Sequence, residues 1–368
     1  MTVVFDQYIL DSDPLYYRSI AVLPFQSLSD DLDDEYFADG MTEALTASLA
    51  KIESIRVISR TSAMRFKGSD LSLPEIARRL GASAIVEAST QQSSERVRIT
   101  VQLIDSETDE HLWSETYDRD ISDILTLQSD MAQEIARQIQ ATITPEEQER
   151  LNASKAIDPA AYDAYLRGMQ HFSRMTPAEL EIAESFFEQA LEIDTDAALP
   201  LASLGMTWVA RALNQIVPNQ VAAPLARGCA ERARMIEDEL PTVHMALSSA
   251  AWLEGKLDES EAHARSAVEL QPSYPDAWAG LANVQLIRED YGQAVEFMRR
   301  AIELDPYNPF YRNVLATALL GARNCNDVIS VQRESRLMFP NLPTLLPTLI
   351  SCLHVIEAFD EVIQAEAD

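Results

Sequence analysis

The chain has 368 residues and a formal net charge of −30. Its length allows two or three domains, and an acidic surplus of this size repels a phosphate backbone, so nucleic-acid binding is not expected. The three cysteines form no C-x-x-C pair, which leaves no zinc or redox motif. The sequence contains no run of about 18 apolar residues, so we expect no membrane span.

Residues 1–18 are aromatic and acidic without a clear period. The pattern fits an arm that docks on a protein and equally an unstructured start, and the sequence leaves both open. Asp6, Asp11 and Asp13 give this stretch the wrong charge for a secretory signal. We therefore expect a cytoplasmic protein, with the periplasm as the alternative if a membrane segment precedes this chain.

Residues 19–150 are expected to form an α/β domain with a mixed sheet. The run 96–105 alternates between apolar and polar side chains, as a half-exposed strand does. A short helix over 73–80 has Pro74 in its first turn and Gly81 after its end. Apolar runs and helical periods indicate further strands over 19–25, 56–59, 84–90 and 110–117, and helices over 41–52 and 123–143. This order of elements is typical of an α/β or α+β protein.

Residues 151–368 carry a repeat of 34 residues. Pro272, Pro306 and Pro340 are separated by this step, and so are the alanines at 233, 267 and 301. The longer distance from 190 to 233 indicates an insertion of about nine residues near 214–224. We expect about five helix-turn-helix units, the last one incomplete, stacked into a linear array.

Both halves resemble known families. The unit at 275–306 has Trp278, Leu281 and Ala294 at the places that the tetratricopeptide repeat (TPR) requires. The strings SIAVLPF, YFADGMTEALTASLAKI, RVISRTS, EIARRLGASAIVEAS and RVRITVQLIDSETDEHLW look like the module related to the N-terminal domain of TolB. The resemblance implies a TolB N-terminal-like α/β domain followed by an all-α TPR superhelix. In bacterial proteins of this kind the module often follows an adenylate cyclase, protein kinase or winged-helix domain.

Motifs for catalysis or cofactor binding are missing from the sequence. The acidic loop 30–35 lacks the glycine and the glutamate that an EF-hand needs. The five histidines show no H-E-x-x-H spacing, and neither a phosphate-binding loop nor the metal-binding aspartate motifs of class III cyclases are found. The sequence therefore predicts no catalytic residue, no metal site and no cofactor.

The TPR resemblance implies that the first helix of each unit lines a concave face. The side chains predicted to contact a partner there are mostly apolar, rich in methionine and free of Lys and Arg: Tyr165, Met169, Phe172, Met206, Met245, Ser249, Trp252, Asn283, Ile287, Asn313 and Thr317. An extended or helical apolar peptide suits such a surface. Packing between units is the alternative role for each of these residues.

We interpret the chain as a non-enzymatic scaffold that binds a protein partner on this face. The alternative is the sensory or regulatory half of a bacterial signalling protein whose output domain is a cyclase, a kinase or a winged-helix domain. The sequence leaves the partner and the oligomeric state open.

Overall fold

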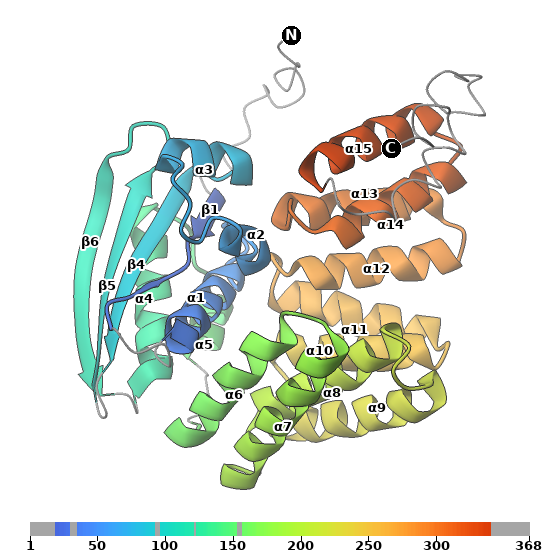
Figure 1. The fold of residues 1–368 in the computed structure, drawn as a ribbon, viewed down its shortest axis with the longest axis horizontal. Helices are drawn as coiled ribbons and strands as arrows, with labels where there is room; N and C mark the ends of the chain where they lie inside the picture. The colour runs from blue at the N-terminus through green and yellow to red at the C-terminus, as the bar shows by residue number, and fades with distance from the viewer. Residues whose placement is uncertain (1–18, 30–34, 93–95, 121–122, 153–156, 340–368) are drawn as a thin grey trace.

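The computed structural model describes residues 19–29, 35–92, 96–120, 123–152 and 157–339. The predicted arm at 1–18 and the incomplete last unit after residue 339 lie outside the described residues. A sheet with its helices forms one side of the molecule, and a curved stack of helices forms the other (Figure 1). The predicted order of an α/β part followed by an all-α part is confirmed.

The sheet is mixed, as the sequence predicts. Its strands are β1 (Ser19–Val22), β2 (Gln26–Ser27), β3 (Arg56–Ile58), β4 (Ala84–Gln92), β5 (Arg96–Asp105) and β6 (His111–Asp120). The strand order is β3-β1-β4-β5-β6, and β2 pairs with β4. β1 is parallel to β3 and β4, whereas β4, β5 and β6 are antiparallel.

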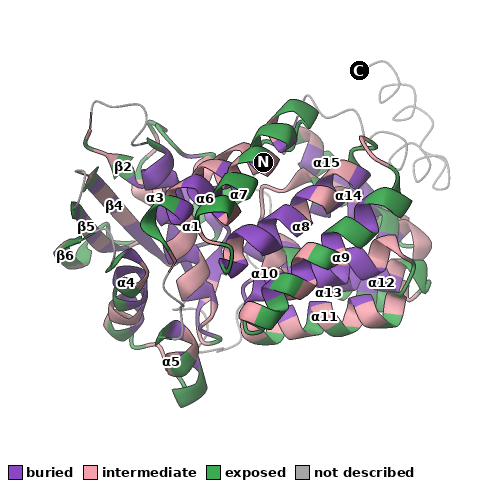
Figure 2. Cartoon of the chain, turned by 90° about the horizontal axis from the view of Figure 1, so that it is seen from below, coloured by how far each residue is buried: buried purple, intermediate pink, exposed green. Residues whose placement is uncertain are grey.

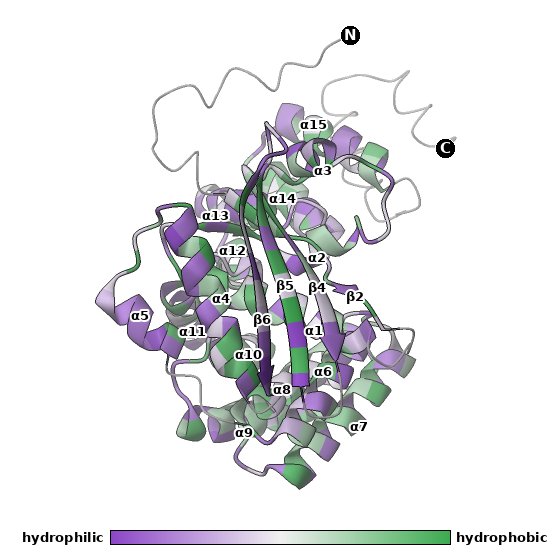
Figure 3. Cartoon of the chain, turned by 90° about the vertical axis from the view of Figure 1, so that its left-hand side faces the viewer, coloured by the Kyte–Doolittle hydropathy of each residue, from purple (hydrophilic) through white to green (hydrophobic). Residues whose placement is uncertain are grey.

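The helices cover the two faces of the sheet unequally. They are α1 (Glu35–Ala50), α2 (Arg60–Met64), α3 (Leu73–Leu80), α4 (Ile124–Gln138) and α5 (Pro145–Asn152). α1 and α4 pack on one face, where alternate residues of β5 such as Val97 and Ile99 join their core. α2 and α3 pack on the other face around Ile58 and Ile85. The opposite face of β5 and β6 has no helix of the described chain over it (Figure 3), and β6 forms an exposed edge (Figure 2).

The all-α part consists of five antiparallel helix pairs in the described chain. Their first helices are α6 (Pro159–Phe172), α8 (Ala198–Leu213), α10 (Pro241–Leu253), α12 (Pro275–Ile287) and α14 (Pro309–Gly321). Their second helices are α7 (Pro177–Ile193), α9 (Asn219–Ile236), α11 (Leu257–Leu270), α13 (Tyr291–Leu304) and α15 (Cys325–Met338). The predicted insertion lengthens the connection between α8 and α9 and the start of α9, which has 18 residues.

The two parts share one hydrophobic core. Tyr162, Tyr165 and Phe187 of the first helix pair belong to the same cluster as Met41 of α1 and Met131 of α4. The boundary predicted at residue 150 therefore separates two kinds of architecture but does not separate two cores. Its role as a folding boundary stays a prediction.

The array also touches the α/β part through the loops between its repeats. Backbone and side-chain bonds join the loop after α11 to β3, where the Ser273 hydroxyl accepts from Val57 N at 3.1 Å. The loop after α13 meets α2, because Ser62 Oγ donates to Asp305 Oδ1 at 2.5 Å and accepts from Tyr307 N at 2.9 Å. The stacked array thus curves along the α/β part, because these loops recur at the repeat step and face the same edge.

Candidate functional site

The structure places the predicted concave residues in three environments. Tyr165 and Met245 are buried, with 8% and 4% of their surface exposed. Ile287 is 52% exposed, and Thr317 is also exposed. The remaining predicted residues are half-buried: Met169, Phe172, Met206, Ser249, Trp252, Asn283 and Asn313.

The two buried residues hold the array together. Tyr165 stacks on Tyr162 at a ring distance of 5.9 Å and lies 6.1 Å from the Phe187 ring, and burial raises its pKa well above the usual tyrosine range. Met245 packs with Ala267 and belongs to the contact between neighbouring repeats. These positions are packing positions, the alternative role that the sequence left open for them.

Trp252 is the predicted residue with the clearest capacity for a further contact. Its indole Nε1 is buried and has no hydrogen-bond partner in the described structure. A buried donor without a partner is costly and uncommon in folded proteins. A partner segment that offers an acceptor near the end of α10 would satisfy it.

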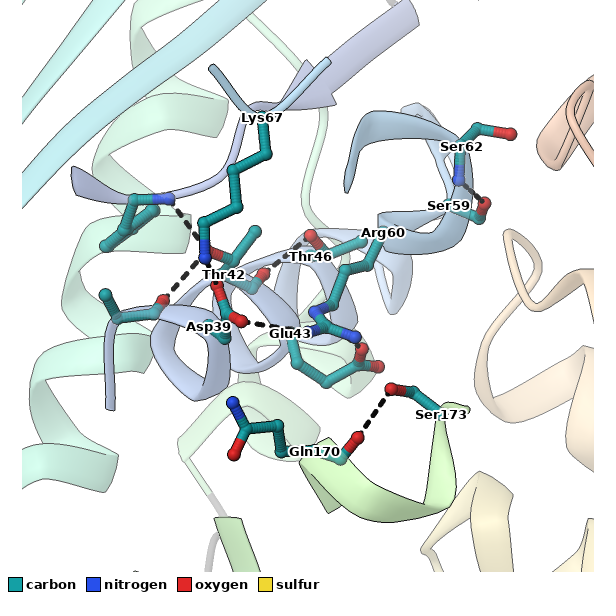
Figure 4. Close-up of polar contacts among 12 residues, drawn as sticks. Asp39, Thr42, Glu43, Thr46, Ser59, Arg60, Ser62, Lys67, Gln170 and Ser173 are labelled. Carbon is teal, nitrogen blue, oxygen red and sulfur yellow. Dashed lines mark hydrogen bonds and ion pairs between the residues drawn. The ribbon is translucent and has the colours of Figure 1, made fainter. Parts of the chain in front are cut away.

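Helix α1 brings charged side chains to the inner side of the array. Lys67 Nζ lies 2.8 Å from Asp39 Oδ1 and 2.8 Å from Glu35 Oε1. Arg60 reaches Asp39 at 3.8 Å and Glu43 at 3.7 Å (Figure 4). Burial lowers the pKa of Lys67, but its hydrogen bonds to the two carboxylates outweigh burial, so the pKa is raised overall. The cluster is therefore a network of fixed charges.

The position of this network follows from how α1 begins. Thr42 Oγ1 accepts from Phe25 N at 2.9 Å and donates to Ala38 O at 2.9 Å, which ties the helix to the loop after β1. Gly40 lets α1 approach α6, because a Cβ at this position would stand 2.7 Å from Leu166 Cδ2. Glu43, one turn further on, points toward the end of α6, where Gln170 and Ser173 lie (Figure 4).

The charge of Glu43 acts on two residues at the start of α12. Burial raises the pKa of Asp276, and the charges of Asp305 and Glu43 raise it further. The hydrogen bond that Asp276 accepts from the Tyr311 hydroxyl acts in the opposite direction. The Asp276 residue is nevertheless exposed to solvent. Burial and then Asp276 and Glu43 also raise the pKa of Tyr274. This group, Glu43, Asp276, Tyr274 and Tyr311, is called the acidic wall below.

The acidic wall was missed by sequence reasoning. Glu43 belongs to the other half of the chain, and no spacing rule links it to residue 276. Asp276 is the second residue of α12, where the sequence indicates only a favourable acidic first turn. The expectation of an inner face with little charge is therefore incomplete, because α1 supplies part of that face.

The described residues offer binding groups but little catalytic chemistry. Within the ranges that the structure covers, no group of three or more His, Cys, Asp or Glu side chains could hold a metal ion. Burial raises the pKa of the Cys229 thiol, which disfavours the thiolate form. No helix in the described part of the chain is long and apolar enough to cross a membrane.

Comparisons with known proteins agree with this architecture. Residues 16–137 match the family model of the second domain of HilA/YgeH-like transcriptional regulators. Residues 275–308 match a tetratricopeptide repeat. The chain thus joins a regulator-type α/β module to tetratricopeptide repeats, a class of repeat that serves protein–protein interaction. The stretch at 19–150 that resembles the TolB N-terminal module overlaps the residues matched by this regulator family.

One curated relative is 34% identical over 247 residues, a Rhizobium meliloti (strain 1021) protein with the provisional name adenylate cyclase 3. The match covers 66% of this chain and 42% of the relative, so the chain spans about two fifths of that protein's length.

Solved structures with a similar fold include a thermophilic TPR protein of Thermus thermophilus. It is 17% identical, with a TM-score of 0.44, covering 53% of this chain and 99% of that one. Another is pilF of Pseudomonas aeruginosa, 18% identical with a TM-score of 0.46, covering 57% and 90%.

Proposed function

We propose that the protein is a non-enzymatic scaffold that holds a partner segment between the inner face of the repeats and helix α1. The observation that carries the proposal is that α1 packs on α6, the first helix of the array, and that the charge of Glu43 on α1 acts on Asp276 of α12. Repeat arrays of this class present extended concave surfaces to other proteins. A groove with two walls selects its partner by both shape and charge.

The partner that fits is an apolar segment with a basic side chain. Half-buried Met169, Met206 and Trp252 offer adaptable apolar contacts. Asp276 and Glu43 offer carboxylates to a Lys or Arg of the partner. The partner is expected to be a protein, in keeping with the repeats and with the acidic charge of −30.

Site-specific crosslinking tests where the partner lies. A photo-crosslinking residue at position 287 should capture a protein in native extract, because Ile287 is 52% exposed on the inner helix α12. The same residue at position 235 is the matched control, since Met235 is 79% exposed but lies on the second helix α9. Capture only from position 235 would contradict the proposal.

The purified partner then allows a test of the two walls. We expect Trp252→Ala to weaken binding about tenfold or more, as truncation of a central aromatic residue commonly does. Glu43→Gln and Asp276→Asn should weaken binding more at low salt than at high salt, because salt screens the attraction between these carboxylates and a basic side chain of the partner. Met235→Ala should bind normally. Equal binding by all four variants would contradict the proposal that the partner lies between the repeats and α1.

A second candidate is the regulatory half of a signalling protein. The match to a regulator's second domain and to a relative named as a cyclase favours it. Under this proposal the present chain has no cyclase activity of its own. Purified chain incubated with ATP and Mg²⁺ or Mn²⁺ should make no cyclic AMP, and steady production that follows the protein through purification would refute this.

A further inference from the structure

Two histidines from different helices face each other in the third repeat. His244 lies in the first turn of α10 and His263 in the middle of α11. Their Nδ1 atoms are 3.3 Å apart, their ring centroids 5.6 Å apart, and their planes are inclined by 35°. The pair is independent of the groove discussed above.

The hydrogen bonds of the pair define its protons. His244 Nε2 lies 2.8 Å from the carbonyl oxygen of Asp238, so this nitrogen carries the proton and donates it. Nδ1 of His244 is left with a lone pair, which accepts from His263 Nδ1–H. Burial and then His244 lower the pKa of His263, which keeps its ring neutral around pH 7.

This geometry fits a tetrahedral metal ion. Two imidazole nitrogens that each bind Zn²⁺ at about 2.0–2.1 Å in tetrahedral geometry are separated by roughly 3.3–3.4 Å. Ligating histidines usually donate their other ring N–H to a carbonyl or carboxylate, and His244 already does so toward Asp238. The charges of Glu259 and Glu231 favour positive charge at the His263 ring, and the charge of Arg234 opposes it.

We propose that His244 and His263 bind a divalent transition-metal ion such as Zn²⁺ or Cu²⁺ through their Nδ1 atoms. No set of three protein ligands exists in the described residues, so water completes the coordination. On binding, His263 moves its proton from Nδ1 to Nε2, and the neutral pair releases no net proton. The ion links α10 to α11 and thereby stabilises the third repeat.

Thermal unfolding with and without ZnCl₂ tests the site in the full-length chain without a histidine tag. In metal excess of about tenfold over Kd, the melting temperature should rise by about 2–4 °C, and EDTA should reverse the rise. His263→Gln should abolish the shift. His171→Gln is the matched control, because His171 bonds to Glu179 at 2.5 Å on another repeat and should leave the shift intact.

A spectroscopic measurement separates ligation from a general effect on stability. Cu²⁺ added to the wild-type chain should give an electron paramagnetic resonance spectrum with nitrogen hyperfine structure, and His263→Gln should lose one of the two nitrogens. A zinc shift that survives His263→Gln, or a copper spectrum that the variant leaves unchanged, would overturn the proposal.

Discussion

Gly168 shows how a single residue sets the spacing of a helix pair. A Cβ built at this position would stand 2.5 Å from Phe187 Cε1, closer than real contacts allow. The Phe187 ring is therefore what requires a residue without a side chain at this position. Gly228, in the middle of α9, is the opposite case because a Cβ there would meet nothing within 4 Å.

The two glycines give a matched pair of substitutions. Gly168→Ala should destabilise the fold by about 1–3 kcal/mol through overpacking. Gly228→Ala should stabilise it by up to about 1 kcal/mol, because alanine is the better helix former. Urea unfolding followed by circular dichroism measures both. A Gly168→Ala variant as stable as the wild type would show that the first helix pair is packed more loosely than described.

Glu254 gives the molecule a pH-dependent bond between repeats. Hydrogen bonds from Arg227 and then from Lys256 lower the pKa of Glu254 to about 2, and Arg227 Nη2 lies 2.7 Å from its Oε2. A carboxyl whose pKa is depressed in the folded state contributes stability above its unfolded pKa of about 4.3. That contribution is lost as the pH falls from there toward 2.

We therefore expect Glu254→Gln to destabilise the protein at pH 7 and to cost less as the pH approaches 3. The measurement is the difference in unfolding free energy between wild type and variant at several pH values. Glu296→Gln is the control, since Glu296 is an exposed residue of α13. A difference that stays constant from pH 7 to pH 3 would contradict the role assigned to Glu254.

At the scale of elements, regular periods were read correctly and their ends less so. The strand at 96–105 and the helix at 73–80 match β5 and α3. The long helix predicted over 123–143 stops at Gln138, where the backbone turns through Gln140 at a φ of 55°. Its apolar period continues beyond that turn, so periodicity alone could not locate the end.

Two other elements lacked the signal on which sequence reading depends. The first apolar run was predicted as one strand over 19–25, but only its first four residues form a strand, β1, because the chain leaves the ladder after Val22; β2 begins beyond the run, at Gln26. α2 has five residues, too few to show a helical period. Yet α2 supplies Ser62 and Arg60, so the missed element is one that positions the acidic wall and the loop contacts.

At the scale of the whole molecule, the 34-residue step predicted the repeats but not what their loops touch. The concave residues were predicted from their position within a repeat, and this rule does not take contacts with the α/β part into account. Contacts such as Ser273 with Val57 join residues more than 200 positions apart. No periodicity connects them, so the contacts of the array with the α/β part required the structure.

Ser273 offers a test of whether these loop bonds hold the array against the sheet. Its hydroxyl accepts from Val57 N and donates to Ile55 O, both at 3.1 Å, and only 5% of the residue is exposed. Ser273→Ala removes the hydrogen-bond partner of the Val57 N–H in β3 and of the Ile55 carbonyl just before β3, which should cost about 1–3 kcal/mol. Ser266→Ala is the control, because that exposed hydroxyl bonds only within its own helix. Hydrogen exchange of the Val57 amide should accelerate in Ser273→Ala and stay unchanged in Ser266→Ala. Since the serine bonds directly to this amide, slow exchange in both variants would mean that the loop after α11 is not what protects β3, and that the shared core around Tyr165 and the loop after α13 hold the array to the α/β part.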